Sequence, residues 1–263
     1  MSVGLSELAG LSDPLLAGEL VRRAGRLLQR VRADNPGLAA DDPKALGRMG
    51  DRESNELIIG LLASARPQDV VLSEESKDSP ERLSASRVWI IDPVDGTREY
   101  GESREDWAVH AALWQDGRLV AGAVAQPDLA AVFTSDPPPD LAPAGEGPVR
   151  LVVSRTRPPV WAQAMAADLG GVLVPMGSAG AKVMSVVRGV SDVYVHAGGQ
   201  YEWDSAAPVA VARAAGLHVS RVDGSEPAYN QADPYLPDIV VCRPELAARV
   251  LAATQQVLSD AQP

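Results

Sequence analysis

One segment of the chain, Trp89 to Thr97, restricts the fold more than any other. It begins with apolar residues that indicate a buried strand, and the proline and glycine after them make a tight turn. Such a turn points the carboxylates of Asp92 and Asp95 and the carbonyl oxygen of Val94 at one place. Oxygen donors grouped in this way suit a hard cation such as Mg²⁺. The backbone N–H groups after Asp95 would then face a phosphate, if a helix begins there.

Two further acidic positions lie at the ends of predicted elements. Glu74 follows the apolar run at 70–72, which reads as another buried strand, and Asp204 begins an apolar helix. Each acid has a structural explanation of its own, because aspartates suit turns and Asp204 can cap its helix. Carboxylates gathered in one site, however, repel one another unless a cation neutralises them. The three clusters together therefore favour a metal site.

The first part of the chain has the spacing of helices. Asp13 and Pro14 are typical of a helix start, with Asp13 as the cap, and apolar residues recur at helical spacing up to Val31. We expect a charged loop over 39–50 and then a second helix that ends before residue 67. Short strands are expected at 70–72, 88–91, 107–114 and 119–124, the last two joined as a hairpin.

The second part of the chain alternates between strand and helix patterns. Strands are expected at 150–153, 172–174, 193–195 and 239–241, and helices from 159, at 179–187, at 205–215 and from 244. This alternation predicts a layered α/β fold. The proline-rich stretch 137–148 marks the best boundary, so we expect one unit over 1–263 with subdomains 1–140 and 149–263.

The charge balance excludes several classes of protein. The chain has 24 Lys and Arg against 35 Asp and Glu, a net charge of −11, so it lacks the basic surface of a nucleic-acid binder. It also lacks a polybasic cluster for an anionic membrane. With no long apolar run, no basic leader and one cysteine, we expect a cytoplasmic protein. Cys242 is expected to be buried, and His110, His196 and His218 to be core or surface residues.

Three pieces of the sequence together resemble the inositol monophosphatase superfamily. They are Asp-Pro-Val-Asp-Gly-Thr at 92–97, Glu74-Glu75, and Trp203-Asp204-Ser205-Ala206-Ala207. The resemblance covers most of the chain and implies an αβαβα sandwich of alternating helix and sheet layers. It also implies a lithium-sensitive phosphatase that uses two or three Mg²⁺ ions, with Mn²⁺ as a substitute.

Three shorter runs resemble one group within this superfamily, the CysQ-type 3′(2′),5′-bisphosphate nucleotidases. They are Gly96-Thr97-Arg98-Glu99-Tyr100, Ser154-Arg155, and the run from Gly177 to Lys182. Such enzymes remove the 3′-phosphate of adenosine 3′,5′-bisphosphate (PAP), a by-product of sulfate assimilation. The resemblance implies that substrate is bound by Gly96, Thr97, Ser154, Arg155, Ser178 and Lys182. For Lys182, an exposed position on its helix is an equal alternative.

The same resemblance assigns roles in catalysis. It implies metal ligation by Glu74, Asp92, the Val94 carbonyl, Asp95 and Asp204. It also implies that Thr97 and Glu74, with Asp51 behind them, orient the attacking water and accept its proton. The neighbourhood of Asp51 departs from the usual Thr-x-Ala-Asp, because the chain has Arg48-Met49-Gly50 before it. This departure leaves the role of Asp51 and a third metal site open.

Two alternatives to the nucleotidase remain open from the sequence. One is a phosphatase for inositol monophosphate or fructose 1,6-bisphosphate that uses the same metals. The other is a non-catalytic acidic protein that binds a divalent ion. The expected partner of the enzyme is a small anionic phosphorylated substrate, also including the sulfated nucleotide PAPS, and the superfamily implies that a homodimer can form.

Overall fold

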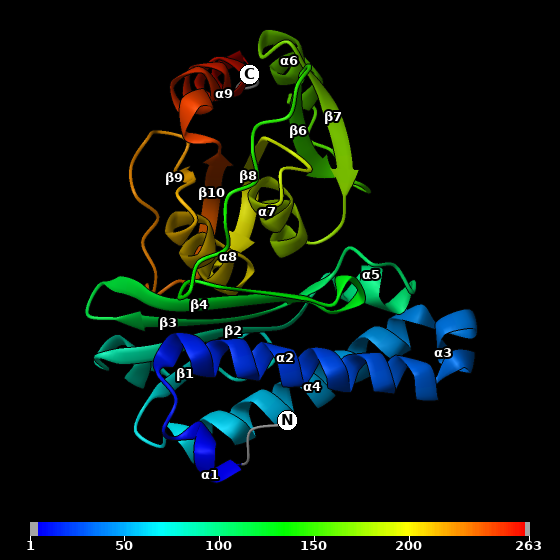
Figure 1. Ribbon diagram of the computed structural model, residues 1–263, viewed down its shortest axis with the longest axis vertical. Helices are drawn as coiled ribbons and strands as arrows, with labels where there is room; N and C mark the ends of the chain where they lie inside the picture. Colours follow the sequence, from blue (N-terminus) through cyan, green and yellow to red (C-terminus); the bar gives the residue numbers. More distant parts are fainter. Residues whose placement is uncertain (1–4, 261–263) are drawn as a thin grey trace.

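Layers of helix and sheet alternate through this protein, whose computed structural model describes residues 5–260. In Figure 1 the order from bottom to top is α2 with α4, the first sheet, α7 with α8, the second sheet, and α6 with α9. The predicted αβαβα sandwich is thus confirmed. The helices of these layers are α2 Asp13–Asp34, α4 Pro43–Ala65, α6 Ala162–Asp168, α7 Ala179–Val187, α8 Glu202–Ala214 and α9 Ala247–Asp260.

The first sheet has the strand order β1-β2-β3-β4-β5. β1 runs parallel to β2, and the other neighbours are antiparallel. Because β1 and β2 are parallel, their carboxyl ends meet at one edge of the sheet, which brings Glu74 close to the turn after β2. The strands are β1 Val70–Ser73, β2 Arg87–Asp95, β3 Ala108–Gln115, β4 Arg118–Gln126 and β5 Ala131–Thr134.

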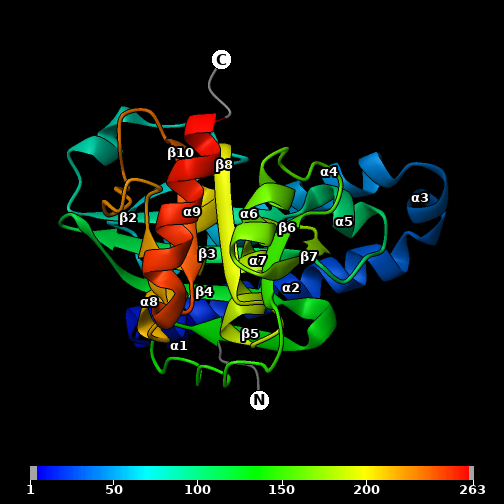
Figure 2. The ribbon, with the colours of Figure 1, turned by 90° about the horizontal axis from the view of Figure 1, so that it is seen from above.

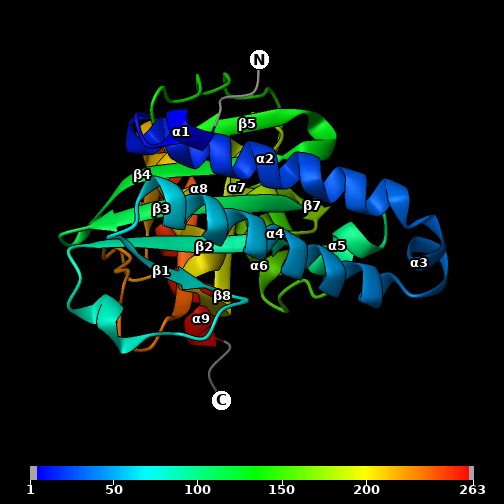
Figure 3. The ribbon, with the colours of Figure 1, turned by 90° about the horizontal axis from the view of Figure 1, so that it is seen from below.

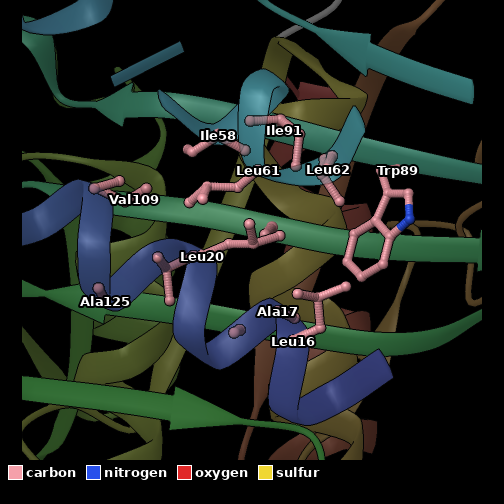
Figure 4. Packing of buried hydrophobic residues seen from close by; sticks show 14 of the residues in the cluster. Leu16, Ala17, Leu20, Ile58, Leu61, Leu62, Trp89, Ile91, Val109 and Ala125 are labelled. Atoms are coloured by element: carbon pink, nitrogen blue, oxygen red, sulfur yellow. The ribbon is translucent and has the colours of Figure 1, made fainter. Parts of the chain in front are cut away.

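Strand β2 is buried on both faces. Trp89 and Ile91 pack in the core that the sheet shares with α2 and α4 (Figure 4). Val88 and Ile90 belong to the core that the sheet shares with α7 and α8. Seen from below, α2 and α4 cross the sheet and extend past it toward the short helix α3, Pro36–Asp41 (Figure 3). A strand buried on both faces is a continuous apolar run, which is why the sequence revealed it.

The second sheet has the strand order β7-β6-β8-β10-β9, with α6 and α9 lying over it (Figure 2). β6 is parallel to β7 and β8, and β10 is antiparallel to β8 and β9. Cys242 is buried in β10, as expected. The strands are β6 Val149–Ser154, β7 Gly171–Met176, β8 Val193–Tyr201, β9 His218–Ser220 and β10 Tyr235–Cys242.

The loop predicted over 39–50 is wrong, because this stretch is mostly helical. It contains the end of α3 and the first two turns of α4, whose N-cap Asp42 accepts the backbone N–H of Ala45 at 3.0 Å. Glycines weaken the helical signal here, yet packing requires them. A Cβ at Gly50 would lie 2.6 Å from the Tyr100 ring. As a result, Asp51 lies on a helix rather than at the end of a loop.

Other local expectations also changed. Asp13 does not cap α2 with its side chain; it forms ion pairs with Arg66 at 2.9 Å and Arg87 at 3.1 Å, which tie α2 to the end of α4 and to β2. The strands β5 and β9 were not predicted. A short helix, α5 Thr97–Gly101, begins directly after the turn at the end of β2.

Residues 137–148 contain neither helix nor strand, as expected of a boundary. The core around α7 and α8 takes residues from both sides of this stretch, and the division into subdomains 1–140 and 149–263 stays a prediction. Within residues 5–260, no helix combines the length and the apolar character that crossing a bilayer requires.

Candidate active site

Three aspartates meet where β2 ends and α8 begins. One carboxylate oxygen from each of Asp92, Asp95 and Asp204 lies within 4.8 Å of the others. The pairing of β2 with β3 is irregular between Asp92 and Asp95, which lets both side chains reach the same place. Asp92 is 1% exposed and Asp95 is 5% exposed. We call these three residues the carboxylate cluster; all of them are predicted metal ligands.

Burial and mutual repulsion perturb the acids in and around the cluster. Burial, together with the charge of Asp95, raises the pKa of Asp204 to about 6. Burial also raises the pKa of Asp92 well above its ordinary value, with a contribution from Glu74. The pKa of Glu74 is raised to about 8 by burial and by Asp204. Crowded carboxylates that repel one another in this way fit a site that a divalent cation neutralises.

Asp95 differs from its neighbours because several donors surround it. Its carboxylate accepts the backbone N–H groups of Ala179 at 3.1 Å and Gly180 at 2.5 Å, at the start of α7. His110 Nε2, on β3, lies 3.2 Å from Asp95 Oδ2. Burial acts to raise the pKa of Asp95, but His110 and the Gly180 N–H outweigh it and hold the pKa below its ordinary value. Asp95 is therefore held as an anion with a fixed orientation.

His110 does more than the sequence suggested. It was expected to be a core or surface residue, and it is fully buried. Its Nδ1 also lies 3.1 Å from the Trp203 carbonyl oxygen. The imidazole thus links Asp95 to the start of α8. No local sequence pattern signals this role, because it follows from the pairing of His110 opposite Asp92 across the sheet.

Asp51 and Thr97 form a second group beside the cluster. Thr97 Oγ1 lies 3.3 Å from Asp51 Oδ1 and 3.2 Å from the Val94 carbonyl oxygen, so its proton has two acceptors. Burial and the charge of Glu75 raise the pKa of Asp51 to about 7, although the hydrogen bond from Thr97 opposes them. The structure thus brings Asp51 to Thr97 despite the unusual residues at 48–50.

Gly96 allows two segments of the site to approach each other closely. Its φ of +89° lies in the left-handed region, and a Cβ there would be 2.9 Å from the Cβ of Ser178. Both conditions require glycine. The turn that carries Asp95 can therefore lie against the start of α7. The phosphate-binding role of Gly96 and Thr97 stays a prediction.

A cavity of about 790 Å³ opens at the carboxylate cluster, lined by Asp95 and Asp204. Three of the predicted substrate contacts, Ser154, Ser178 and Lys182, also line it. Arg155 is not among the described residues that do so; it pairs with two glutamates, Glu99 at 2.9 Å and Glu102 at 3.0 Å. The sequence reasoning missed several lining residues, namely Arg98, Arg157, His196, Gln200 and Tyr201.

Lys182 is buried rather than exposed, at 6% exposure. Its ammonium group donates to the carbonyl oxygens of Gly177 and Ser178, the latter at 2.8 Å, and lies 5.5 Å from the centre of the Tyr194 ring. Burial lowers the pKa of Lys182. The lysine thus fixes the turn before α7 and places a positive charge in the cavity wall.

Comparison with known proteins agrees with this geometry. The model of the inositol monophosphatase family matches residues 15–136 and 150–259. This chain therefore belongs to the inositol monophosphatase family. Among solved structures, inositol monophosphatase II from Staphylococcus aureus superposes with a TM-score of 0.77 at 20% identity and covers 92% of this chain and 95% of its own.

More similar relatives carry a nucleotide in their names. A protein of Mycobacterium leprae named 3′-phosphoadenosine 5′-phosphate phosphatase is 48% identical over 262 residues, which are 95% of this chain and 96% of that protein. The 3′(2′),5′-bisphosphate nucleotidase CysQ of Escherichia coli is 26% identical over 83% of this chain and 94% of its own. The structure of CysQ from Bacteroides thetaiotaomicron matches with a TM-score of 0.75 at 25% identity and covers 88% and 97% of the two chains.

Proposed function

We propose that this protein is a Mg²⁺-dependent phosphatase that removes the 3′-phosphate of PAP to give adenosine 5′-phosphate. The observation that carries the proposal is the buried carboxylate cluster, which opens into a cavity lined by cationic and aromatic side chains. The relative at 48% identity, named for the same nucleotide, supports this substrate. PAPS, which has the same 3′-phosphate, is a second candidate substrate.

The donors present fit Mg²⁺, because they are carboxylate and carbonyl oxygens in a buried, mutually repelling group. Asp92, Asp95, Asp204, Glu74 and the Val94 carbonyl would hold two or three ions, and Mn²⁺ offers a substitute. When bound, Mg²⁺ supplies Lewis-acid stabilisation of phosphate oxygens and makes a water more acidic.

The chain's own residues then position water and proton. Thr97 Oγ1 donates to Asp51, which leaves its oxygen lone pairs free to accept a hydrogen bond from the attacking water. Glu74 orients the same water, and Asp51, with a pKa of about 7, takes up the proton. The water oxygen attacks phosphorus in line, the bond from phosphorus to the ribose 3′ oxygen breaks, that oxygen takes up a proton from solvent water, and Asp51 releases its proton to solvent. The products are adenosine 5′-phosphate and inorganic phosphate.

The cavity wall offers a surface for a nucleoside. Tyr201 is 46% exposed, lines the cavity and stacks on Trp203 with 4.9 Å between ring centres and 9° between planes. A rigid, exposed aromatic face of this kind stacks well on a nucleobase and has little to offer inositol. Arg98 and Arg157 provide charge for the second phosphate of PAP.

A substrate panel tests the proposal. Phosphate release is measured with PAP, inositol 1-phosphate and fructose 1,6-bisphosphate in Mg²⁺, with EDTA and with millimolar lithium. We expect kcat/KM for PAP to exceed the others by about tenfold or more, since base and second phosphate each add binding energy. EDTA should abolish release, and added Mg²⁺ should restore it. Equal kcat/KM for PAP and inositol 1-phosphate would contradict the nucleotide assignment.

We also propose a cytoplasmic location, which the single cysteine favours. A homodimer is a further proposal, motivated by the sequence resemblance. Sedimentation of the purified protein measures its oligomeric state.

A further inference from the structure

A fully buried arginine lies outside the cavity. Arg82, in the short 3₁₀ helix Pro80–Leu83 between β1 and β2, has a side chain that is 1% exposed. Its guanidinium donates to both oxygens of Asp78, at 2.7 and 3.0 Å. The remaining donors point at a distant part of the chain, and the mechanism described above uses none of these groups.

That distant part is the loop before β10. Arg82 donates to Asn230 Oδ1 at 3.0 Å, and Asn230 Nδ2 donates back to the Arg82 carbonyl at 3.0 Å. The backbone N–H groups of Asn230 and Gln231 in turn donate to the carboxylate of Glu202, at 2.6 and 2.7 Å. Glu202, 1% exposed, is the first residue of α8. A chain of hydrogen bonds therefore runs from Asp78, whose side chain is 43% exposed, through the buried Arg82 and Asn230 to Glu202.

Both ends of this chain of bonds adjoin predicted metal ligands. Asp78 lies four residues after Glu74, in an irregular stretch that follows β1. Glu202 lies two residues before Asp204, in the same helical turn. Glu74 follows a strand of the first sheet and Asp204 lies in a helix of the middle layer, yet both charges raise the pKa of Asp92.

We infer that Arg82 is a positioning residue that holds the Glu74 segment and the start of α8 at the spacing the metal site needs. This inference rests on the proposed function. Metal ligation requires both acids in their ionised form, in which they repel each other, and a restraint outside the site keeps the segments that carry them together. Arg82 provides that restraint with a forked, fixed geometry that suits two partners at once. Because the two segments are already held in place, metal binding loses less conformational entropy and is tighter.

A role in stability alone is a weaker explanation of these bonds. Arg82 is buried but Asp78 is 43% exposed, so water weakens their attraction while the guanidinium still carries the cost of its desolvation. Apolar packing, however, does not fix the orientation of one segment relative to the other. The bidentate contact with Asp78 and the reciprocal contact with Asn230 fix both distance and angle between the two segments.

Mn²⁺ binding, followed by electron paramagnetic resonance without substrate, tests the inference directly. Arg82→Lys keeps the charge and loses the fork, whereas Asn230→Gly keeps the left-handed backbone and loses the link to Arg82. We expect each variant to bind Mn²⁺ about tenfold or more weakly than the wild type, because replacing a residue that orients metal ligands commonly lowers metal affinity by this much. The half-saturating Mg²⁺ concentration for PAP hydrolysis should rise in parallel. If Arg82→Lys fails to fold, Asn230→Gly alone decides.

Arg150→Lys is the matched control. Arg150 makes the same forked contact with Asp192 and bonds the Gly189 carbonyl, but its partners adjoin no predicted ligand. We expect its Mn²⁺ affinity to stay within twofold of the wild type, whatever happens to its melting temperature. Unchanged Mn²⁺ affinity in the Arg82 and Asn230 variants, or an equal loss in Arg150→Lys, would overturn the inference. Because the binding assay contains no nucleotide, a wild type that binds Mn²⁺ but does not hydrolyse PAP contradicts the proposed function alone.

Discussion

The carboxylate cluster and the rim of the cavity are built in opposite ways. The cluster residues are largely buried and held by backbone groups, as when Asp95 accepts the N–H groups of Ala179 and Gly180. The rim, which we define as Arg98, Arg157 and Tyr201, consists of long exposed side chains. Under the proposed function, this difference predicts a division of labour in which the cluster sets the rate of the chemical step and the rim selects the substrate. Two experiments test this division, and a third tests the packing beneath the cluster.

The largest effect is expected from Asp204→Asn. The amide keeps the shape of the side chain but removes one charge from the cluster, so kcat should fall by about 10²-fold or more with the fold intact. Steady-state kinetics with PAP measure the effect, and circular dichroism checks the fold. Glu56→Gln, at an exposed position of α4, is the control and should leave kcat unchanged. Near-normal turnover of Asp204→Asn would contradict the assignment of the cluster.

A smaller and more selective effect is expected from Tyr201→Ala. Loss of a stacking face worth about 1–3 kcal/mol should raise KM for PAP about tenfold, with little change in kcat. KM for inositol 1-phosphate should hardly move. Tyr235 offers a matched control, because it is equally exposed at 46% and stands edge-on to Tyr201, yet is not among the described residues that line the cavity. If Tyr235→Ala had the same effect, the rim would not be selecting through Tyr201.

The smallest effect on catalysis is expected beneath the cluster, at Gly50 of α4. A methyl group at Gly50 would press on Tyr100, at 2.6 Å, and on Leu28, at 3.0 Å, so Gly50→Ala should lower the free energy of unfolding by about 1–3 kcal/mol. Thermal or urea unfolding measures this change, and kcat of the folded fraction should stay within a few-fold. Gly60→Ala, on the same helix, meets no described atom within 4 Å and should stabilise by about 0.5–1 kcal/mol. Equal effects at the two glycines would refute the packing argument.

The sequence predicted those parts of the fold that depend on near neighbours. The buried strands, the turn after Ile91 and the two helices of the middle layer all appear in periodicity and local composition. The start of α4 was missed because its glycines look like loop residues until Tyr100 is placed against them. Propensity is local, whereas this helix is decided by packing with residues about fifty positions away.

The site shows the same limit. The three members of the carboxylate cluster were predicted together because Asp92 and Asp95 share one turn and Asp204 lies at the start of a helix. His110 was missed because only the pairing of β3 with β2 brings it to Asp95. Arg155 was assigned to the nucleotide from a short motif; in the structure it pairs with Glu99 and Glu102, and its contact with a nucleotide stays a prediction. Contacts that cross between layers cannot be read from spacing along the chain.

The helix layer between the two sheets also restricts which parts of the protein can move or accept substitutions. Helix α8 is enclosed by both sheets, and its residues from Ser205 to Ala212 are buried. A movement of α8 would open the core that it shares with both sheets, so Asp204 stays where the surrounding layers hold it. In the proposed function, substrate and product therefore pass the exposed rim. Because the rim side chains belong to none of the buried clusters, we expect single substitutions there to change the choice of substrate while the carboxylate cluster beneath them stays in place.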